Sequence, residues 1–474
     1  MRAAALLRHA RLAVARSTRS TYPGVNVSPR RALCGALSAR SANPPPPCVT
    51  TVGRQPLPST SRRRRSSSAS TVAAAAPATG AGAPSSLDRT PLVERPPSAV
   101  TTLADLAAWT AWARGAVAAL GSDGLAADGG PSAAELQVRA NDRERERERE
   151  REDWACSAAR PLSHAPSLQS ELRWFLEDTV AGVAGPAGEP PPSPPQGAPP
   201  AWPALAARLV GDSTGSTTPI WLRTPLADLT TRWTARLNDR VPFQYTVGAA
   251  HWRDLVLAVG PGVLCPRPET EQLVDLAVGA VKAAGDAAIN NHTGGGPWAD
   301  VCTGSGAVAA GLMSAFRGAG LRVPETVWAT DVCPAAASWA RANVARLGLQ
   351  GTVRVVEGDL LAALPPGTPP LRGLLSNPPY IPQAQMPGLQ PEVGLHEPSL
   401  ALDGGDAAGL VILRRLCTAA ATALAPGGFL GLETAGHGQA ELVAALLIGG
   451  NDFEGVAVHE DMCGVVRFVT GRRR

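Results

Sequence analysis

A strand pattern that runs into a glycine-rich turn and then into an apolar helix pattern most constrains the fold of this chain. Residues 298–302 form the strand pattern, Thr303, Gly304, Ser305 and Gly306 form the turn, and the helix pattern begins at Ala307. Glycines permit a tight turn and close approach of the backbone to a ligand, while a helix N-terminus offers free N–H groups. On its own, the Gly-x-Gly string is weak evidence for a nucleotide-like ligand.

The next two strand patterns end in acidic residues. Residues 325–330 are followed by Asp331, at a spacing close to the roughly 20 residues expected between such glycines and a ribose-binding acid. Two charge-assisted hydrogen bonds from ribose hydroxyls would contribute about 1.5–3 kcal/mol each. The alternative is that Asp331 caps the helix that begins near Pro334. After the strand pattern at 352–356, Asp359 and Leu360 are suited to an adenine amino group and its flat face, or Asp359 is a solvated loop acid.

Residues Asn377, Pro378, Pro379 and Tyr380 follow a fourth apolar strand pattern at 371–376. We call these four residues the amide cradle. The Asn377 side-chain carbonyl and the Pro378 backbone carbonyl can each accept one N–H of a planar NH2 group, two prolines stiffen the backbone, and Tyr380 offers an aromatic face. An ordinary turn is the alternative, but ligands of open α/β sheets bind at the carboxyl ends of strands, and this position favours a binding role.

These features together resemble the class I S-adenosylmethionine-dependent methyltransferases that act on nitrogen. Further strings resemble the HemK-type release factor glutamine methyltransferases in particular; they lie at 242–248, 261–271, 397–405, 427–433 and 461–467. The resemblance covers residue 242 to the C-terminus, and weakly the helical region before it. The chain departs from the family pattern at three places: Cys302 stands where glycine is usual, Cys333 stands where serine is more common, and residues 433–436 differ slightly from the usual ending of that strand.

The resemblance implies an activity and its participants. The methyl donor would be S-adenosyl-L-methionine, and the acceptor would be the glutamine in the Gly-Gly-Gln loop of a class I peptide-chain release factor. The amide cradle would bind that glutamine and carry catalysis. The residues expected to line the cofactor are Cys302, Thr303, Gly304, Ser305, Gly306, Asp331, Asp359, Leu360 and Asn377. No strong general base is expected, because the methylated amide can lose its proton to solvent.

The expected fold class is α/β, with a seven-stranded, mostly parallel Rossmann-like sheet whose last strand is antiparallel. Later helix patterns lie at 334–347, 407–423 and 439–447, and the last two strand patterns lie at 455–458 and 465–469. A linker hairpin and the methyltransferase domain would occupy 241–474. A small helical domain would occupy 88–240, with low-complexity inserts that include an Arg-Glu run at 143–152 and a proline-rich segment at 189–203.

The first 87 residues contain arginine but no acidic residue. This composition, rich in Ser, Thr and Ala, is typical of an organelle transit peptide; a basic arm that binds nucleic acid is the alternative. The Ser, Ala and Pro content favours the chloroplast over the mitochondrion. The sequence contains no run of 18 apolar residues, so no membrane span is predicted.

Two other classes of function compete with the methylation of glutamine. A nucleic-acid adenine-N6 methyltransferase could use the same amide cradle, but no target-recognition domain or dense basic and aromatic surface follows Asp88, so no stable nucleic-acid binding is expected. A non-catalytic cofactor-binding protein is disfavoured because the donor turn and the amide cradle are both complete. The eight cysteines include no Cys-x-x-Cys pair, so we predict neither a disulfide framework nor a metal site.

Overall fold

The computed structural model describes residues 89–120, 168–191, 202, 205–206, 216–284 and 296–474. All of these residues belong to one unit of the chain. The predicted transit segment at 1–87, the Arg-Glu run at 143–152 and most of the proline-rich segment at 189–203 lie outside the described residues. What the sequence predicts for those segments stays a prediction.

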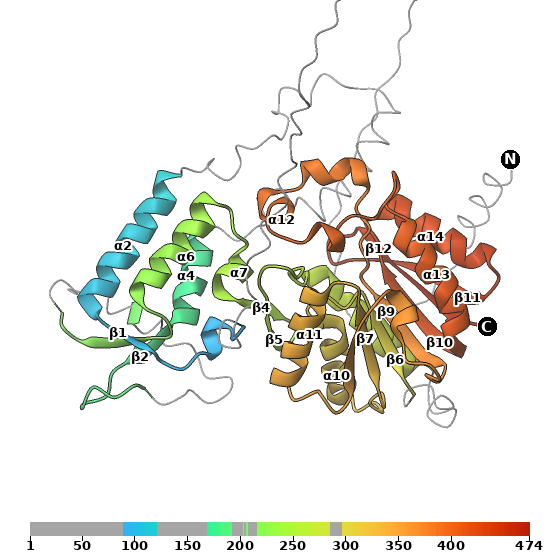
Figure 1. Ribbon diagram of the computed structural model, residues 1–474, viewed down its shortest axis with the longest axis horizontal. Coiled ribbons are helices and arrows are strands. Elements are labelled where there is room, and N and C mark those ends of the chain that lie inside the picture. The colour runs from blue at the N-terminus through green and yellow to red at the C-terminus, as the bar shows by residue number, and fades with distance from the viewer. Residues whose placement is uncertain (1–88, 121–167, 192–201, 203–204, 207–215, 285–295) are drawn as a thin grey trace, which may run out of the picture. The chain divides into compact units, whose positions relative to one another are not determined.

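The predicted sheet of seven strands is confirmed, as is its antiparallel final strand (Figure 1). Across the sheet the strands are β11 (Phe453–Glu460), β12 (Val466–Arg473), β10 (Leu424–Glu433), β9 (Leu371–Ser376), β6 (Trp298–Val301), β7 (Val327–Asp331) and β8 (Val353–Glu357). In this sheet β12 alone runs in the direction opposite to the other strands. The chain therefore has the α/β fold of class I S-adenosylmethionine-dependent methyltransferases. The strand order reverses between β6 and β9, which makes a switch point where ligands of such sheets bind.

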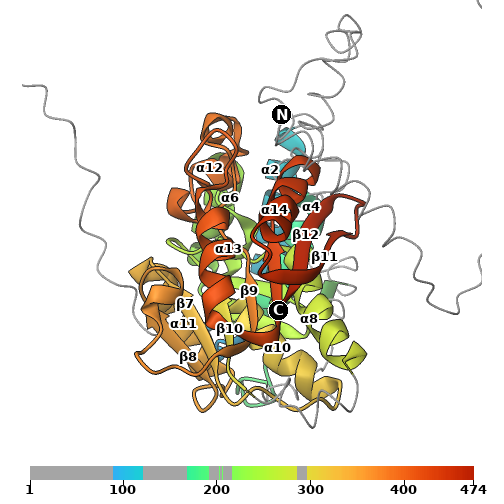
Figure 2. The same ribbon diagram turned by 90° about the vertical axis from the view of Figure 1, so that its right-hand side faces the viewer.

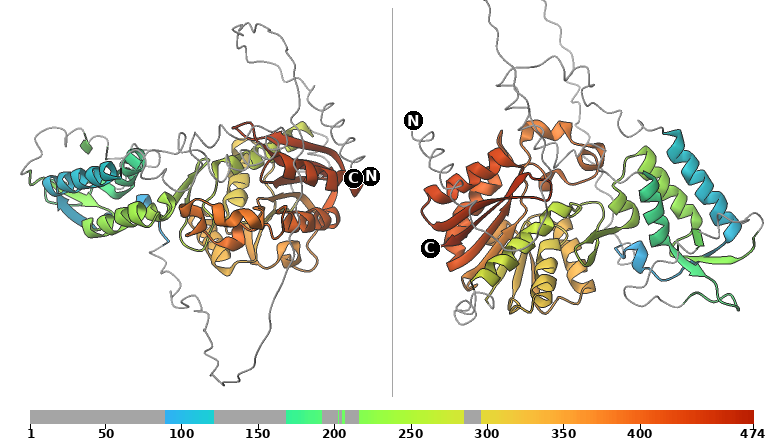
Figure 3. Two further views of the ribbon diagram at one scale, coloured as in Figure 1. Left: turned by 90° about the horizontal axis from the view of Figure 1, so that it is seen from above. Right: turned by 180° about the vertical axis from the view of Figure 1, so that it is seen from behind.

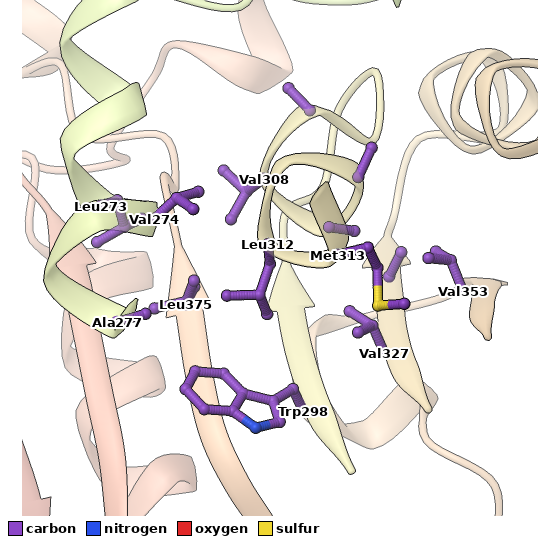
Figure 4. Packing of buried hydrophobic residues seen from close by; sticks show 14 of the residues in the cluster. Leu273, Val274, Ala277, Trp298, Val308, Leu312, Met313, Val327, Val353 and Leu375 are labelled. Carbon is purple, nitrogen blue, oxygen red and sulfur yellow. The ribbon is translucent and has the colours of Figure 1, made fainter. Parts of the chain in front are cut away.

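Helices cover both faces of this sheet (Figures 1 and 2). One face carries α8 (Glu271–Ala283), α10 (Ala307–Gly318) and α11 (Pro334–Arg346), and the other carries α13 (Val411–Ala423) and α14 (His437–Gly449). Because successive strand residues point to opposite faces, Trp298 joins the first core and Ala299 the second. Figure 4 shows Trp298 among Leu312, Leu375 and Ala277 in the first core.

The indole of Trp298 fills the space beside Gly373 on β9. A Cβ atom added at Gly373 would lie 2.2 Å from two ring atoms of Trp298. The ring also meets Phe316 edge-on, with 5.4 Å between the ring centroids. A glycine inside this strand therefore serves close packing, and it holds β9 and β6 at the switch point.

Helix α13 begins later than the sequence predicts. The helix pattern was expected from residue 407, whereas the structure starts α13 at Val411. The Asp406 carboxylate accepts hydrogen bonds from the backbone N–H groups of Ala408 and Leu410. Gly409 adopts a left-handed backbone with φ of +64°, so these residues form a turn that precedes the helix.

The small N-terminal domain contains helices, as the sequence predicts, and α2 (Leu103–Ala119), α4 (Leu168–Thr179) and α6 (Leu226–Asn238) lie side by side in Figure 3. Thr102 caps α2, because its hydroxyl oxygen accepts a hydrogen bond from the Asp105 N–H at 3.0 Å. The domain also contains a sheet that the sequence analysis did not predict. Its strands, in the order β1 (Ala99–Thr102), β3 (Pro219–Leu222) and β2 (Val180–Val183), are antiparallel and have four residues each.

A connecting segment joins the small domain to the seven-stranded sheet. It contains α7 (Phe243–Val247), the hairpin of β4 (Ala249–Trp252) and β5 (Leu255–Ala258), and the 3-10 helix η2 (Pro268–Thr270). Other short helices are η1 (Leu92–Glu94), η3 (Leu360–Ala363), η4 (Gln383–Gly388), α12 (Pro391–Gly394) and η5 (Ser399–Ala401). Within the described residues, no helix combines the length and apolar character needed to cross a membrane.

The start of the described chain is attached to α11. The Arg89 guanidinium lies 5.0 Å from the centre of the Trp339 ring and donates to the Ser338 hydroxyl at 2.6 Å. The Trp339 indole N–H in turn donates to the Pro261 carbonyl, after the β4–β5 hairpin, at 3.2 Å. A cation over an indole face is held by the ring's negative quadrupole, so Arg89 anchors the chain where the small domain begins.

Candidate functional site

Three predicted site residues meet at the carboxyl edge of the sheet. Cys302, Asp331 and Asn377 follow or end the neighbouring strands β6, β7 and β9. A pocket at this edge is lined by five of the predicted residues, Cys302, Gly304, Asp331, Asn377 and Pro379. The predicted residues that do not line it are Thr303, Ser305, Gly306, Asp359, Leu360, Pro378 and Tyr380.

The glycine turn has the left-handed backbone that its sequence predicts. Gly304 and Gly306 have φ of +55° and +84°, and Cys302 has φ of +61° although it carries a side chain. A left-handed conformation costs a non-glycine residue roughly 1–2 kcal/mol, which accounts for the usual glycine at the position of Cys302. A Cβ atom at Gly304 would meet no atom within 4 Å, so the space above the turn is open to a ligand.

Asp300 supports the turn from below, a role that the sequence analysis missed. Its carboxylate accepts hydrogen bonds from the Thr303 hydroxyl at 2.6 Å and from the Ala309 N–H, in the first turn of α10, at 2.9 Å. Burial raises the pKa of Asp300 to about 7, although these hydrogen bonds act to lower it. Since the Thr303 side chain is used here and Ser305 is buried, both residues would meet a ligand through backbone groups.

Asp331 connects the turn to the start of α11. One carboxylate oxygen accepts from the Gly304 N–H and the other from the Cys333 N–H, each at 2.9 Å. The helix cap itself is Cys333, which makes no side-chain cap hydrogen bond, so Asp331 is not the N-cap residue. Burial raises the pKa of Asp331, while the hydrogen bonds from Cys333 and Gly304 act to lower it. A carboxylate beside an open glycine turn is a suitable acceptor for a ribose diol.

Asp359 and Leu360 lie beyond the pocket. The Asp359 carboxylate is half exposed and forms an ion pair with Arg415 at 2.5 Å. Leu360 has a left-handed backbone and packs into the core beneath α13. Neither residue lines the pocket, although the preceding Gly358 N–H donates to the Asp331 carbonyl at 2.8 Å, and their adenine contacts stay a prediction.

The amide cradle is held in place by contacts to three other segments. The Asn377 Nδ2 atom donates to the Thr270 hydroxyl at 3.0 Å, so the amide NH2 is engaged by the protein. The Tyr380 hydroxyl donates to Glu433 at 3.2 Å, and the Tyr380 carbonyl accepts from the Gln439 side chain at 3.0 Å. Burial raises the pKa of Tyr380, which keeps its hydroxyl a hydrogen-bond donor.

Four polar residues around the cradle were quoted in the sequence motifs without a role. Thr270 and Glu433 contact the cradle directly. Arg267 forms an ion pair with Glu397, whose side chain is 1% exposed, and Glu397 also accepts from the Cys265 N–H at 3.3 Å. One signal in the sequence could have indicated such a role. Glu433 is a charged residue at the end of an apolar run, and charged residues are rarely buried unless they have a partner.

The described part of the chain contains no set of side chains that could bind a metal ion. No group of three or more His, Cys, Asp or Glu side chains there is arranged to hold an ion. Cys265, Cys302, Cys333 and Cys417 are free thiols. The polar groups at the pocket are therefore a carboxylate, backbone N–H groups and an oriented amide, which suit a neutral or cationic nucleoside ligand and a planar NH2 group.

Comparison with known proteins gives close relatives. The chain is 42% identical over 237 residues to the release factor glutamine methyltransferase of Gloeobacter violaceus, covering 50% of this chain and 76% of that protein. It is 40% identical over 250 residues to the release factor glutamine methyltransferase of Thermosynechococcus vestitus, covering 53% of this chain and 80% of that protein. No protein-family model matches the chain. Among solved structures, a methyltransferase from Pyrococcus furiosus is 18% identical with a TM-score of 0.32, covering 46% of this chain and 89% of that one.

Proposed function

The chain belongs to the release factor glutamine methyltransferase family, and we propose that it methylates the glutamine of the Gly-Gly-Gln motif in an organellar class I peptide-chain release factor. The enzyme would be a protein-(glutamine-N5) methyltransferase that uses S-adenosyl-L-methionine. The observation that carries the proposal is the meeting of Gly304, Asp331 and Asn377 at one pocket. This pocket combines a site for a nucleoside with an oriented acceptor for an amide NH2.

The side chains at the pocket fit the cofactor. The open space above Gly304 admits a close ligand, and the Asp331 carboxylate can accept hydrogen bonds from two ribose hydroxyls. S-adenosylmethionine supplies an electrophilic methyl group on its sulfonium. No proton must be removed before the methyl transfer. The protein therefore accelerates the reaction mainly by binding and orienting the two substrates.

The amide cradle prepares the glutamine nitrogen for attack. Because Asn377 commits its NH2 group to Thr270, its carbonyl oxygen is left to accept an N–H from the glutamine amide. The Pro378 carbonyl is the second acceptor that the sequence predicts, although Pro378 itself does not line the pocket. As the nitrogen–carbon bond forms and the carbon–sulfur bond breaks, positive charge develops on nitrogen, and both oxygens stabilise it. The methylated amide then releases one proton to solvent.

The organellar assignment rests on the first 87 residues. They contain no acidic residue and an Arg-rich, Ser-rich composition, which is typical of transit peptides. We place the enzyme in the chloroplast, with the mitochondrion as the alternative. A fluorescent protein fused behind residues 1–87 tests this directly, since a signal that fills the cytosol would exclude import.

The activity is tested by methyl transfer from labelled S-adenosylmethionine to a purified organellar release factor. The control is the same factor with the glutamine of its Gly-Gly-Gln motif changed to alanine. Label on the native factor alone would support both the reaction and the acceptor. Plasmid DNA in a parallel reaction tests the adenine-N6 alternative, and label on DNA with none on the factor would overturn the proposal.

A further inference from the structure

Glu433 is a buried carboxylate directly behind the amide cradle. It ends β10, and the parallel pairing of Leu432 with Ser376 places it beside Asn377 at the neighbouring strand end. The residue is only 1% exposed. Burying a carboxylate costs several kcal/mol unless the group is paired or neutralised, so this residue type is not explained by packing alone.

The two oxygens of Glu433 have different surroundings. Oε1 accepts the hydrogen bond from the Tyr380 hydroxyl, at the last residue of the cradle. Oε2 is buried and has no hydrogen-bond partner. The hydroxyl of Thr270, which is itself 4% exposed, lies near this carboxylate and acts to lower the pKa of Glu433, and turning its proton toward Oε2 would give that oxygen the partner it lacks. The same hydroxyl oxygen accepts from Asn377 Nδ2 at 3.0 Å, so Thr270 stands between Glu433 and Asn377.

The Thr270 hydroxyl has one proton to donate. The group to which it donates that proton decides which way the Asn377 amide is turned. When Thr270 gives its proton to a carboxylate, its oxygen can only accept from Asn377, which must then present NH2 to Thr270 and its carbonyl oxygen to the substrate. When the proton is not taken up, Thr270 can donate to the Asn377 carbonyl instead. The amide would then turn its NH2 group toward the NH2 of the glutamine, where two donors meet.

We propose that Glu433 is a positioning residue which, through the Thr270 hydroxyl, orients the Asn377 amide for the acceptor and, through Tyr380, fixes the other end of the cradle. This inference rests on the proposed function, because the acceptor is taken to be an amide NH2. Glu433 does not touch the substrate. It acts on the two residues that do.

The charges around Glu433 make this device sensitive to pH. Arg467 on β12 favours the ionised form and is held by Asp461 at 2.9 Å, whereas Glu269 disfavours it. Burial is the largest influence, and it raises the pKa of Glu433 to about 7. Only the ionised carboxylate must accept the Thr270 proton. Turnover should therefore fall as the pH drops below about 7, as Glu433 becomes protonated.

The decisive variant is Glu433→Gln in the full-length protein, because glutamine keeps the shape but can donate to Thr270. We expect turnover of the release factor to fall about 10- to 100-fold and the acidic limb attributed to Glu433 to disappear from the pH profile. Thr270→Val should cause a similar loss, and Thr270→Ser, which restores the hydroxyl, should rescue most of it. Glu454→Gln at an exposed position of β11 is the matched control. Binding of S-adenosylmethionine is measured in every sample, so that lost affinity is separated from lost turnover.

A second measurement tests the orientation without any acceptor. In protein labelled with 15N at asparagine, the Asn377 side-chain NH2 signals, assigned by their loss in Asn377→Asp, should exchange slowly with solvent in the wild type. They should exchange faster in Thr270→Val and Glu433→Gln. If the wild type methylates the factor but Glu433→Gln keeps its turnover and pH profile, the inference fails and the proposed function stands. If the wild type methylates nothing, the proposed function fails. If the Asn377 NH2 protons exchange equally fast in the wild type and in the variants, the inference fails as well.

Discussion

The buried ion pair between Arg236 and Glu171 allows a sharp test of the packing of the small domain. Arg236 of α6 donates to both oxygens of Glu171 of α4, at 2.7 and 3.0 Å, and the two side chains are 6% and 8% exposed. Arg236 also donates to Glu392 of α12 at 3.1 Å. Replacing Arg236 with Met leaves the Glu171 charge buried without this partner, and we expect a loss of about 3–5 kcal/mol in the free energy of unfolding.

Glu392 should contribute little to that loss. It keeps two hydrogen bonds from Arg240, at 2.7 and 2.8 Å, so its charge stays paired in the Arg236→Met variant. The penalty therefore comes from Glu171 alone. Removing both charges in Glu171→Met/Arg236→Met should restore the stability to within about 1–2 kcal/mol of the wild type, because apolar side chains of similar volume can replace a buried ion pair.

Urea unfolding followed by tryptophan fluorescence measures these differences. Arg173→Met is the matched control, since Arg173 is exposed and its ion pair with Glu177, at 3.6 Å, should contribute less than about 0.5 kcal/mol. The two single variants and the double variant form a cycle with a coupling energy of roughly 2 kcal/mol or more. A loss below about 1 kcal/mol for Arg236→Met, or strictly additive losses, would refute the reasoning.

Three further predictions concern the site. Asn377→Ala should lower turnover about 10²-fold or more, because one oriented acceptor is lost, and activity near that of the wild type would exclude the mechanism. Asp331→Asn should weaken S-adenosylmethionine binding about tenfold or more by calorimetry, whereas an unchanged Kd would remove the ribose role. Burial raises the pKa of Asp300 from 3.8 to about 7, so the native state holds a proton that the unfolded chain releases, and stability falls as the pH rises between these values by up to about 1.4 kcal/mol per unit. Asp300→Asn should make the dependence of unfolding free energy on pH less steep in that range, and an unchanged slope would contradict this account.

The elements predicted correctly are those with a strong local signal. The strand, glycine turn and helix around Gly304 were found because apolar periodicity and glycine chemistry are both local, and the four strand ends followed from the same pattern. The start of α13 was wrong by several residues because Asp406 and Gly409 stabilise a turn inside an apolar pattern. The apolar periodicity does not show that a turn, stabilised by hydrogen bonds to a side chain, competes with the helix here.

What the sequence analysis missed depends on contacts between distant residues. Each strand of the small sheet has four residues, and their partners are far apart in the chain, so no hairpin pattern indicated them. Thr270 contacts Asn377 across 107 positions, and Arg267 contacts Glu397 across 130. The residues were visible in the motifs, but their pairing was not. The fold brings them together, and only then do they have a role in the cradle.

The anchor formed by Arg89 on Trp339 would be kept or lost according to where the predicted transit segment is cleaved. The small domain is fastened to α11 at its beginning by this cation–π contact, and it continues at its end into the hairpin that Trp339 also holds through Pro261. A cleavage before Arg89 would leave both fastenings in place. A cleavage after it would remove the contact between Arg89 and Trp339, and the small domain would keep its other contacts, from Arg236 and Arg240 to Glu392 of α12.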